Sequence, residues 1–224
     1  MSFFADVIDL ILPEHCAGCG AALVSLCAAC ALPLRAPARP AGTAPKGLPP
    51  PWTVAAYEGR LRAILAAYKE HGRTALAVPL GEALATAVRA ALEPRPGHDP
   101  PLLVWVPSGR GVTRRRGHDA LRGLVDVASR RLRDEGLPIV AVNALRQRGR
   151  VADQAALTAA QRRANLEGAL EVMPRVDVSG RRILLVDDVI TTGASLSEAA
   201  RALRGGGADV LGAATIAATP RRRP

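Results

Sequence analysis

The segment 183–195, which reads ILLVDDVITTGAS, limits the fold of this chain more than any other part of its sequence. A continuous apolar run leads directly into two neighbouring carboxylates, Asp187 and Asp188, as in a strand that is buried on both faces and ends at a polar edge. A short loop with one glycine follows and opens at once into a helical pattern. In open α/β sheets, ligands bind at the carboxyl ends of such strands. The segment therefore predicts an α/β fold with a ligand site at the acidic pair.

The loop after the acidic pair has the composition of a phosphate site. Backbone N–H groups of residues 191–195 lie near a predicted helix N-terminus, where such groups bind anions. Thr191, Thr192 and Ser195 add hydroxyl donors. Two adjacent carboxylates accept hydrogen bonds from a vicinal diol or act on a bound magnesium ion. Phosphate, diol and metal together describe a phosphorylated ribose.

Two other interpretations of this segment compete with a ribose phosphate site. Ordinary solvated acids at a strand end, followed by a threonine N-cap, are compatible with the same residues. A phospho-acceptor receiver domain also begins with an apolar strand and an acidic pair, but it needs about a hundred further residues to complete its sheet. Residues 189–224 follow the pair in this sequence, so we do not expect a receiver domain.

The rest of the chain alternates between helical and strand patterns. Apolar residues at i, i+3 and i+4 predict helices, and short apolar runs between glycines and prolines predict buried strands. Asp119 is expected to cap the helix that follows it. Residues 151–165 are polar and alanine-rich, without a clear apolar face. The expected helices are 59–72, 76–92, 119–133 and 194–203, and the expected strands are 102–106, 138–145, 182–186 and 208–217. This alternation favours a parallel sheet flanked by helices.

All four cysteines lie in one short window, as the pairs Cys16/Cys19 and Cys27/Cys30. Two CxxC turns at this spacing are typical of a structural zinc site, in which four thiolates complete a tetrahedron and leave no position open. His15 is a further possible ligand, although four thiolates suffice. Two disulfides or a redox dithiol are the alternatives. The expected cytoplasmic location disfavours the disulfides, and two CxxC pairs at this spacing disfavour the redox dithiol.

The net charge of 30 − 20 = +10 favours partners that carry phosphate, whether nucleic acids or phosphorylated metabolites. Arginine runs at 114–116, 130–131 and 221–223 contribute to this charge, and a merely solvated basic surface is equally compatible with it. Aromatic residues make up 3% of the chain, too few for the stacking platforms of single-strand binders.

Composition divides the chain into four parts. We expect a four-cysteine zinc module at 1–35, a linker at 36–51, a main domain at 52–219 and a basic tail at 220–224. The 36–51 stretch is rich in proline, alanine and glycine, which predicts a semi-rigid linker that buries no core. No apolar run approaches the ~18 residues that span a bilayer. Residues 3–12 carry two aspartates and no basic region, unlike a signal peptide. We therefore expect a soluble, cytoplasmic protein without a membrane span.

Residues 186–195 resemble the phosphoribosyl pyrophosphate motif of type I phosphoribosyltransferases, including the acidic pair and the Thr-Thr-Gly-x-Ser turn. A four-cysteine module ahead of such a domain is similar to the layout of the ComF family, the competence-type phosphoribosyltransferase-like proteins. Further resemblance lies in Tyr57-Glu58-Gly59, in 65–73, in 116–119 and in 153–165. The chain departs from the common family pattern at 106–110 and at His118-Asp119.

The resemblance implies a type I phosphoribosyltransferase-like fold that binds phosphoribosyl pyrophosphate, or a similar ribose phosphate, with magnesium. Asp187 and Asp188 would hold the ribose hydroxyls. The 5′-phosphate would lie on the loop made by Val189, Ile190, Thr191, Thr192, Gly193, Ala194 and Ser195. Candidates for the pyrophosphate are Ser108, Gly109, Arg110 and the 114–116 run with Arg116, and weaker candidates on a further loop are Arg162 and Asn165.

Two functions follow from the resemblance. The first is a ligand-binding protein that assists DNA uptake or single-stranded DNA handling together with DNA-uptake proteins. The alternative is an active phosphoribosyltransferase that transfers phosphoribose to an unidentified acceptor and releases pyrophosphate. Relatives of this fold are often homodimers.

Overall fold

The computed structural model describes residues 15–42, 44–93, 101–108, 119–148 and 168–220. Its centre is a six-stranded sheet in the order β1-β2-β8-β7-β3-β4, in which every neighbouring pair is parallel except β1 with β2. The strands are β1 Arg39–Pro40, β2 Trp52–Ala56, β3 Leu102–Trp105, β4 Val140–Val142, β7 Arg182–Ile190 and β8 Asp209–Ala218. A separate antiparallel pair consists of β5 Leu145–Gln147 and β6 Leu170–Val172.

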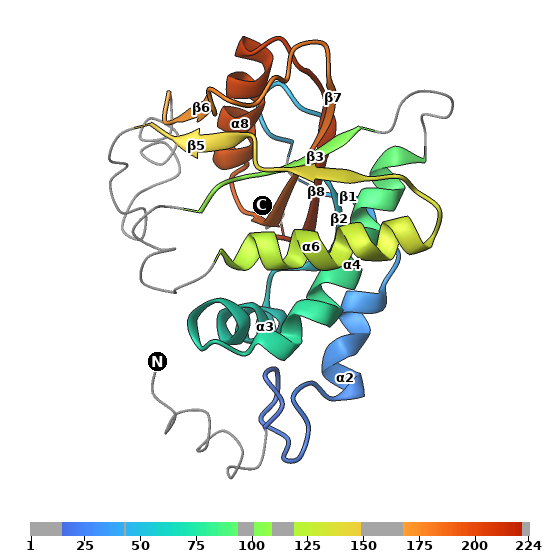
Figure 1. Ribbon diagram of the computed structural model, residues 1–224. Helices are drawn as coiled ribbons and strands as arrows, with labels where there is room; N and C mark the ends of the chain where they lie inside the picture. The colour runs from blue at the N-terminus through green and yellow to red at the C-terminus, as the bar shows by residue number, and fades with distance from the viewer. Residues whose placement is uncertain (1–14, 43, 94–100, 109–118, 149–167, 221–224) are drawn as a thin grey trace, which may run out of the picture.

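Helices cover both faces of the sheet (Figure 1). They are α2 Ala28–Ala31, α3 Gly59–Glu70, α4 Ala77–Leu92, α6 Ala120–Asp134 and α8 Ala194–Gly205, with short 3₁₀ turns at Leu32–Arg35 and Thr74–Leu76. The residues of β7 alternate between two cores. Leu184 and Val186 pack in the core shared with α3, α4 and α6, whereas Ile183 and Leu185 pack in the core shared with α8. Burial on both faces explains the continuous apolar run of this strand.

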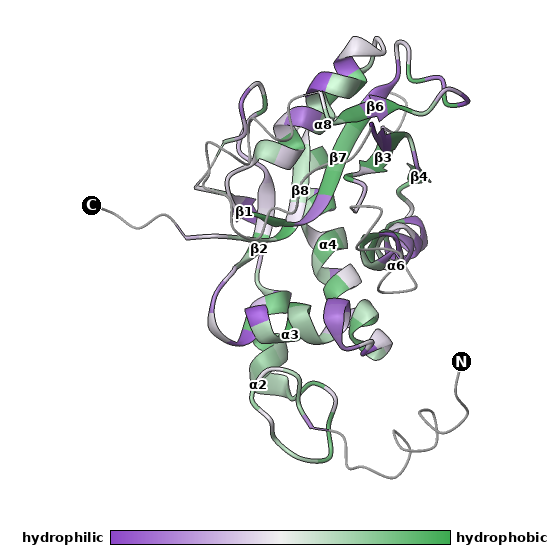
Figure 2. Ribbon diagram, turned by 90° about the vertical axis from the view of Figure 1, so that its left-hand side faces the viewer, coloured by the Kyte–Doolittle hydropathy of each residue, from purple (hydrophilic) through white to green (hydrophobic). Residues whose placement is uncertain are grey.

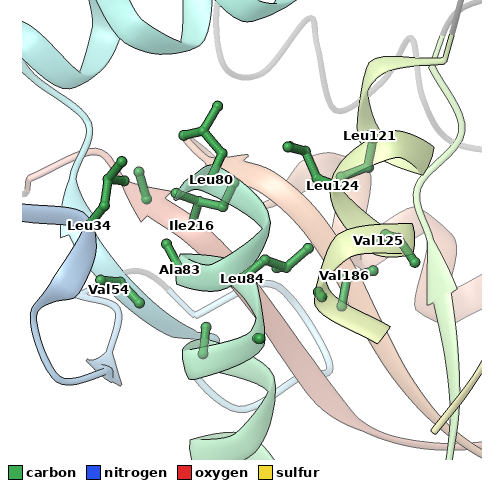
Figure 3. Packing of buried hydrophobic residues seen from close by; sticks show 14 of the residues in the cluster. Leu34, Val54, Leu80, Ala83, Leu84, Leu121, Leu124, Val125, Val186 and Ile216 are labelled. Atoms are coloured by element: carbon green, nitrogen blue, oxygen red, sulfur yellow. The ribbon is translucent and has the colours of Figure 1, made fainter. Parts of the chain in front are cut away.

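Close packing of α4 and α6 against the sheet fills the larger core. Leu80 and Leu84 of α4 and Leu124 of α6 are fully buried there, together with Val186 and Ile216 of the sheet (Figure 3). Figure 2 shows the same division by hydropathy: β7 is hydrophobic along most of its length and turns hydrophilic near one end. This hydrophilic end carries the predicted site.

One stretch, Thr74–Leu92, is long and apolar enough to cross a membrane by length and composition alone, contrary to our expectation from the sequence. In this fold it forms the turn before α4 and α4 itself, whose buried side chains pack on α6 and on the sheet. Pro79 lies in the first turn of α4, where its missing N–H removes no helical hydrogen bond.

The predicted helices and most predicted strands are confirmed. The Asp119 side chain accepts a hydrogen bond from the backbone N–H of Arg122, as expected of an N-cap. The strand expected at 138–145 is instead divided between β4 and the start of β5. Strand β7 also runs further than predicted, because β8 pairs with it through Ile190 opposite Ala218, so the acidic pair lies within the strand. The segment 151–165 is outside the described residues.

The prediction that residues 36–51 bury no core is wrong. Strand β1 pairs with β2, the backbone N–H of Ala41 donates to the carbonyl of Pro51 at 2.7 Å, and Leu48 is buried in the α8-side core. The Arg204 guanidinium donates to the carbonyl of Gly47 at 2.9 Å. Proline fixes the backbone of this segment without requiring donors to be paired, so a few apolar side chains suffice to hold it on the sheet.

Candidate functional site

The acidic pair lies near the carboxyl end of β7, between β8 and β3. Asp188 is buried, with 8% of its surface exposed, and Asp187 is half-buried. The backbone N–H of Asp188 donates to Oδ1 of Asp187 at 2.9 Å. Because successive residues of a strand point to opposite faces, the two carboxylates approach a ligand from different sides of the strand.

Lys69, in the last turn of α3, forms an ion pair with Asp188. The side chains are mostly buried, with 24% of Lys69 and 11% of Asp188 exposed. Helix α3 is fixed in the core by Ile64 and Leu65, and the Tyr68 hydroxyl donates to the carbonyl of Ala120 at 2.8 Å. Lys69 is not among the candidate residues predicted from the sequence, although it lies within the 65–73 stretch that resembles the family.

Burial raises the pKa of Asp187 from 3.8 to about 7, even though the nearby positive charge of Lys69 lowers it. A carboxyl group with this pKa is partly protonated at neutral pH. It becomes a full hydrogen-bond acceptor when a cation or a hydroxyl donor approaches it. Such perturbed groups are enriched at functional sites.

The loop after β7 turns sharply into α8 at Gly193. This residue is the N-cap of α8 and has a left-handed φ of 77°, which only glycine adopts readily. A Cβ at Gly193 would also lie 3.1 Å from Pro45 of the 36–51 segment. The N–H of Ala194 donates to Oγ1 of Thr192 at 3.4 Å. The loop 191–193 therefore leads directly into the first turn of α8, which begins at Ala194.

The side chains of the predicted phosphate loop differ in exposure. Thr191 is exposed and Thr192 and Ser195 are half-buried, so these hydroxyl-bearing residues retain solvent access. Val189 and Ile190 pack in the two cores on opposite faces of the sheet, and Ala194 is buried. In this arrangement the two apolar residues anchor the loop to the fold.

The residues expected to meet pyrophosphate are described only in part. Ser108 is half-buried and follows β3, whose end is tied to β7 by the Val106 N–H donating to the carbonyl of Val186 at 3.1 Å. The Trp105 indole N–H donates to Asp119 at 3.3 Å, which joins the two ends of the 106–119 stretch. The remaining candidates lie outside the described residues; they are Gly109, Arg110, Arg116 with the rest of 114–116, Arg162 and Asn165.

The four cysteines come together in one cluster, and all four are free. Their sulfurs lie within 4.8 Å of one another, and Sγ of Cys19 is 3.7 Å from Sγ of Cys27. A tetrahedral zinc site with Zn–S bonds of about 2.3 Å has sulfurs about 3.8 Å apart. The cluster therefore needs only a small contraction to hold a tetrahedral metal ion.

The surroundings of Cys16 and Cys30 shift the pKa values of their thiols in opposite directions. Burial alone would raise the pKa of Cys16, but backbone N–H groups of Cys27, Gly18 and Cys19 lower it to about 6. The backbone N–H of Cys27 donates to Sγ of Cys16 at 3.4 Å. Burial, together with the neighbouring thiols, raises the pKa of Cys30 to about 12. A cation in the cluster would stabilise all four thiolates.

The cysteine module packs directly on α3. Cys16 and Cys30 are buried in the core that also contains Ile64 and Leu65. The Arg73 guanidinium, just after α3, donates to the carbonyl of Ser25 at 3.3 Å. Helix α3 therefore contacts the cysteine module and also carries Lys69 to the acidic pair.

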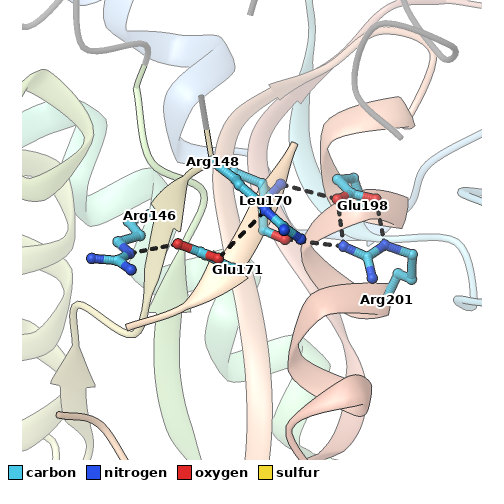
Figure 4. A network of polar contacts seen from close by, with 6 residues as sticks. All are labelled: Arg146, Arg148, Leu170, Glu171, Glu198 and Arg201. Carbon is cyan, nitrogen blue, oxygen red and sulfur yellow. Dashed lines mark hydrogen bonds and ion pairs between the residues drawn. The ribbon is translucent and has the colours of Figure 1, made fainter. Parts of the chain in front are cut away.

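A polar network fixes the β5–β6 pair to α8 (Figure 4). The Glu198 carboxylate is buried, accepts the N–H of Leu170 at 3.0 Å and pairs with Arg201 at 2.7 Å. Arg201 also donates to the carbonyl of Leu170 at 3.0 Å. On β5 and β6, Arg146 pairs with Glu171 at 2.8 Å. The network holds the end of β6 against the helix that follows the predicted phosphate loop.

Comparison with known proteins gives several matches that cover part of the chain. Residues 123–224 match the phosphoribosyl transferase domain family. The chain is 44% identical over 50 residues to an orotate phosphoribosyltransferase of a Nocardioides species, which is 22% of this chain and 28% of that enzyme. The match therefore spans less than a third of the enzyme. A solved adenine phosphoribosyltransferase from Rhodothermus marinus is 21% identical, with a TM-score of 0.37, over 84% of this chain and 86% of its own.

A longer match covers most of the chain. The DNA utilization protein YhgH of Escherichia coli O157:H7 is 31% identical over 188 residues, which are 82% of this chain and 80% of that protein. The match, the phosphoribosyltransferase domain and the N-terminal cluster of four cysteines agree with one another. The chain therefore belongs to the ComF family of proteins with a phosphoribosyltransferase fold.

Proposed function

We propose that the protein binds phosphoribosyl pyrophosphate, or a closely related ribose phosphate, with magnesium. We also propose that it takes part in DNA handling. The observation that carries the proposal is the acidic pair near the carboxyl end of β7, followed within a few residues by the Gly193 turn and the N-terminus of α8. Carboxylates suited to a diol and a loop suited to a phosphate therefore follow one another within a single strand–loop–helix unit.

Each part of the ligand has a chemical counterpart in the site. Asp187 and Asp188 accept hydrogen bonds from the ribose hydroxyls. Thr191, Thr192 and Ser195 and the loop backbone bind the 5′-phosphate, aided by the positive end of the α8 dipole. Magnesium binds through one or two carboxylates plus phosphate oxygens, which an acidic pair beside a pyrophosphate provides. Of the residues predicted from the sequence to meet pyrophosphate, Ser108 is the one that lies within the described part of the chain.

We propose that zinc occupies the four-cysteine cluster in a structural role. The sulfur separations and the N–H donors to Cys16 fit four thiolate ligands and leave no place for a substrate. Zinc would fix the fold of a small module whose contact with α3 is otherwise made by a few buried side chains. No part of the proposed ligand chemistry requires this metal.

Participation in DNA handling rests on two observations. One is the relative of E. coli O157:H7, whose name is DNA utilization protein. The other is the net charge of +10, which favours binding to phosphate backbones. We expect single-stranded DNA to bind with an affinity that falls steeply with salt. Fluorescence anisotropy with a labelled oligonucleotide at about 50 and about 200 mM salt measures this slope, and salt-independent or absent binding contradicts the DNA assignment.

A second candidate function is catalysis of phosphoribosyl transfer, which the intact acidic pair and phosphate loop favour. The enzyme would displace pyrophosphate from the anomeric carbon through a transition state that resembles an oxocarbenium ion, as at glycosidic carbons. Release of pyrophosphate in the presence of a mixture of acceptors distinguishes an enzyme from a binding protein.

Calorimetric titration with phosphoribosyl pyrophosphate and magnesium tests the main proposal. The comparison is between the native chain and the double variant Asp187→Asn, Asp188→Asn, which keeps the side-chain volumes. We expect binding to the native chain and its loss in the double variant. A folded, zinc-loaded native chain that does not bind the ligand refutes the proposal.

A further inference from the structure

Lys69 places a positive charge on the acidic pair from an element distant in the sequence. It lies in α3, 119 residues before Asp188 in the numbering of the chain, yet its ammonium group contacts that carboxylate. Its charge also reaches Asp187, since it lowers the pKa of that group. A lysine is therefore part of the site that we assign to the ribose diol.

The position of Lys69 is determined by the fold. Its neighbour Tyr68 is buried and hydrogen-bonded to the backbone at the start of α6, while Leu65 is buried one turn earlier. With the helix fixed in this way, the lysine side chain extends from a rigid base to the edge of β7. Lys69 and Asp188 are both mostly buried, so solvent screens their attraction less than in an exposed pair.

A ribose diol bound to the acidic pair brings the anomeric carbon close to this lysine. The hydroxyl-bearing carbons of the diol are C2 and C3, and C1 is directly bonded to C2. With the C2 hydroxyl assigned to Asp188 and the C3 hydroxyl to Asp187, a group on C1 lies beside the hydroxyl that Asp188 accepts. An ammonium has three donors, so Lys69 can keep one hydrogen bond to Asp188 and direct another to an oxygen of that group.

We infer that Lys69 is a specificity-determining residue that binds the pyrophosphate on the anomeric carbon. This inference rests on the proposed function, because it assumes that the acidic pair holds the ribose diol. Lys69 distinguishes phosphoribosyl pyrophosphate from ribose 5-phosphate, which carries only a hydroxyl on C1. In the free protein Asp188 neutralises the ammonium and keeps it in place for the anionic ligand.

Calorimetric titrations of the native chain and of Lys69→Met with both ligands, in the presence of magnesium, test the inference. Loss of one charge-assisted hydrogen bond should weaken phosphoribosyl pyrophosphate by roughly 10- to 100-fold. Ribose 5-phosphate should change by less than about threefold, because its diol and phosphate contacts remain. Arg130→Met is the matched control: Arg130 is exposed on α6, and its loss removes the same charge without touching the site.

An NMR measurement on labelled lysine monitors the Lys69 side chain directly. The sequence has two lysines, Lys46 and Lys69, so a protein with ¹³C-labelled lysine gives two ε-methylene signals, and Lys46→Met assigns them. We expect phosphoribosyl pyrophosphate to shift the Lys69 signal much more than ribose 5-phosphate does. The variant Lys69→Arg keeps the positive charge and should recover most of the lost affinity, which separates a charge effect from misfolding.

The outcomes separate the two proposals. Equal weakening of both ligands by Lys69→Met means that Lys69 only supports Asp188, and it overturns the inference while the proposed function stands. Unchanged binding of both ligands, or a Lys69 signal that no ligand moves, overturns it as well. If the native chain binds neither ligand, the proposed function fails and the inference fails with it.

Discussion

Gly18 faces the sulfur of Cys30 so closely that a Cβ placed on this glycine would lie 2.7 Å from Sγ and 3.3 Å from Cδ1 of Ile64. Its φ is not positive, so the glycine is required by lack of space and not by backbone conformation. The same position touches a cysteine of the cluster and the helix that carries Lys69. Packing at Gly18 thus connects the metal module to α3.

We predict that Gly18→Ala destabilises the protein by about 1–3 kcal/mol, because the added methyl group must displace the Cys30 side chain or α3. It should also weaken zinc binding. Urea unfolding and a competition titration with a zinc-binding dye measure the two effects. The control is Gly205→Ala, since a Cβ there meets nothing within 4 Å. If the Gly18→Ala variant keeps native stability and native zinc affinity, the prediction is wrong and the module accommodates the added methyl group without cost.

We predict that Glu198→Gln lowers the unfolding free energy by about 1–2 kcal/mol at pH 7, through the loss of the charge-assisted pair with Arg201. Burial raises the pKa of Glu198, but Arg201 and the Leu170 N–H outweigh it and the net pKa is lowered. A carboxyl whose pKa is lower in the folded state stabilises at pH values above its unfolded pKa of 4.5, and this stability disappears as the pH falls through the folded value.

Urea unfolding between about pH 3 and pH 7 checks this prediction. The native chain and Glu198→Gln should converge in stability at the acid end. Glu171→Gln is the control, because its carboxylate pairs with Arg146 in a more exposed setting and should contribute less than about 1 kcal/mol. A constant difference between the Glu198 variant and the native chain across this range contradicts the assigned ionisation.

Local patterns predicted much of this fold. The helices at α3, α4, α6 and α8 follow from apolar periodicity, and the buried run before Asp187 identified the central strand. These features depend on residues close in the sequence, which is why they are readable without a structure. The same holds for the cysteine spacing, which predicted the cluster.

Contacts between distant segments could not be predicted. Nothing near Lys69 in the sequence indicates that its ammonium reaches Asp188, because the pair depends on how α3 packs beside the sheet. The 36–51 stretch has the composition of a linker, yet Leu48 and Pro45 are buried on the α8 side of the sheet. Amino-acid composition predicts the local backbone preference of a segment. It does not show that a surface of the sheet elsewhere in the fold is available for that segment to cover.

We predict that removal of zinc destabilises the cysteine module and, through it, α3. A chelator such as EDTA should lower the melting temperature, and Cys30→Ser should reproduce this shift and make the protein insensitive to the chelator. Cys30 and Ile64 share one core, so the loss should extend beyond the module. Differential scanning fluorimetry measures the shift, and hydrogen exchange should show faster exchange in α3. Equal melting temperatures with and without chelator would falsify the structural role.

Asp187 makes ligand binding and stability depend on pH in opposite directions. Burial raises its pKa to about 7 in the folded protein, against 3.8 for the free group. A carboxyl whose pKa is higher when folded binds more protons in the folded state between these values. The folded state favours the protonated carboxyl. The contribution of Asp187 to the free energy of unfolding is therefore fully present below a pH of 3.8 and is lost as the pH rises through about 7.

We therefore predict that Asp187→Asn is more stable than the native chain at pH 8, by about 2 kcal/mol after allowance for solvent screening at a half-buried site. This advantage should shrink as the pH falls below about 7 and disappear near 3.8, where the carboxyl is protonated in both the folded and the unfolded chain. Ligand binding should follow the opposite trend: affinity for ribose 5-phosphate rises from about pH 6 to pH 8, as Asp187 ionises and accepts the diol, and the Asn variant lacks this rise. Denaturation curves and calorimetric titrations over the same pH series test both trends. A native chain and an Asn variant with parallel pH profiles in both measurements would show that Asp187 is ionised throughout.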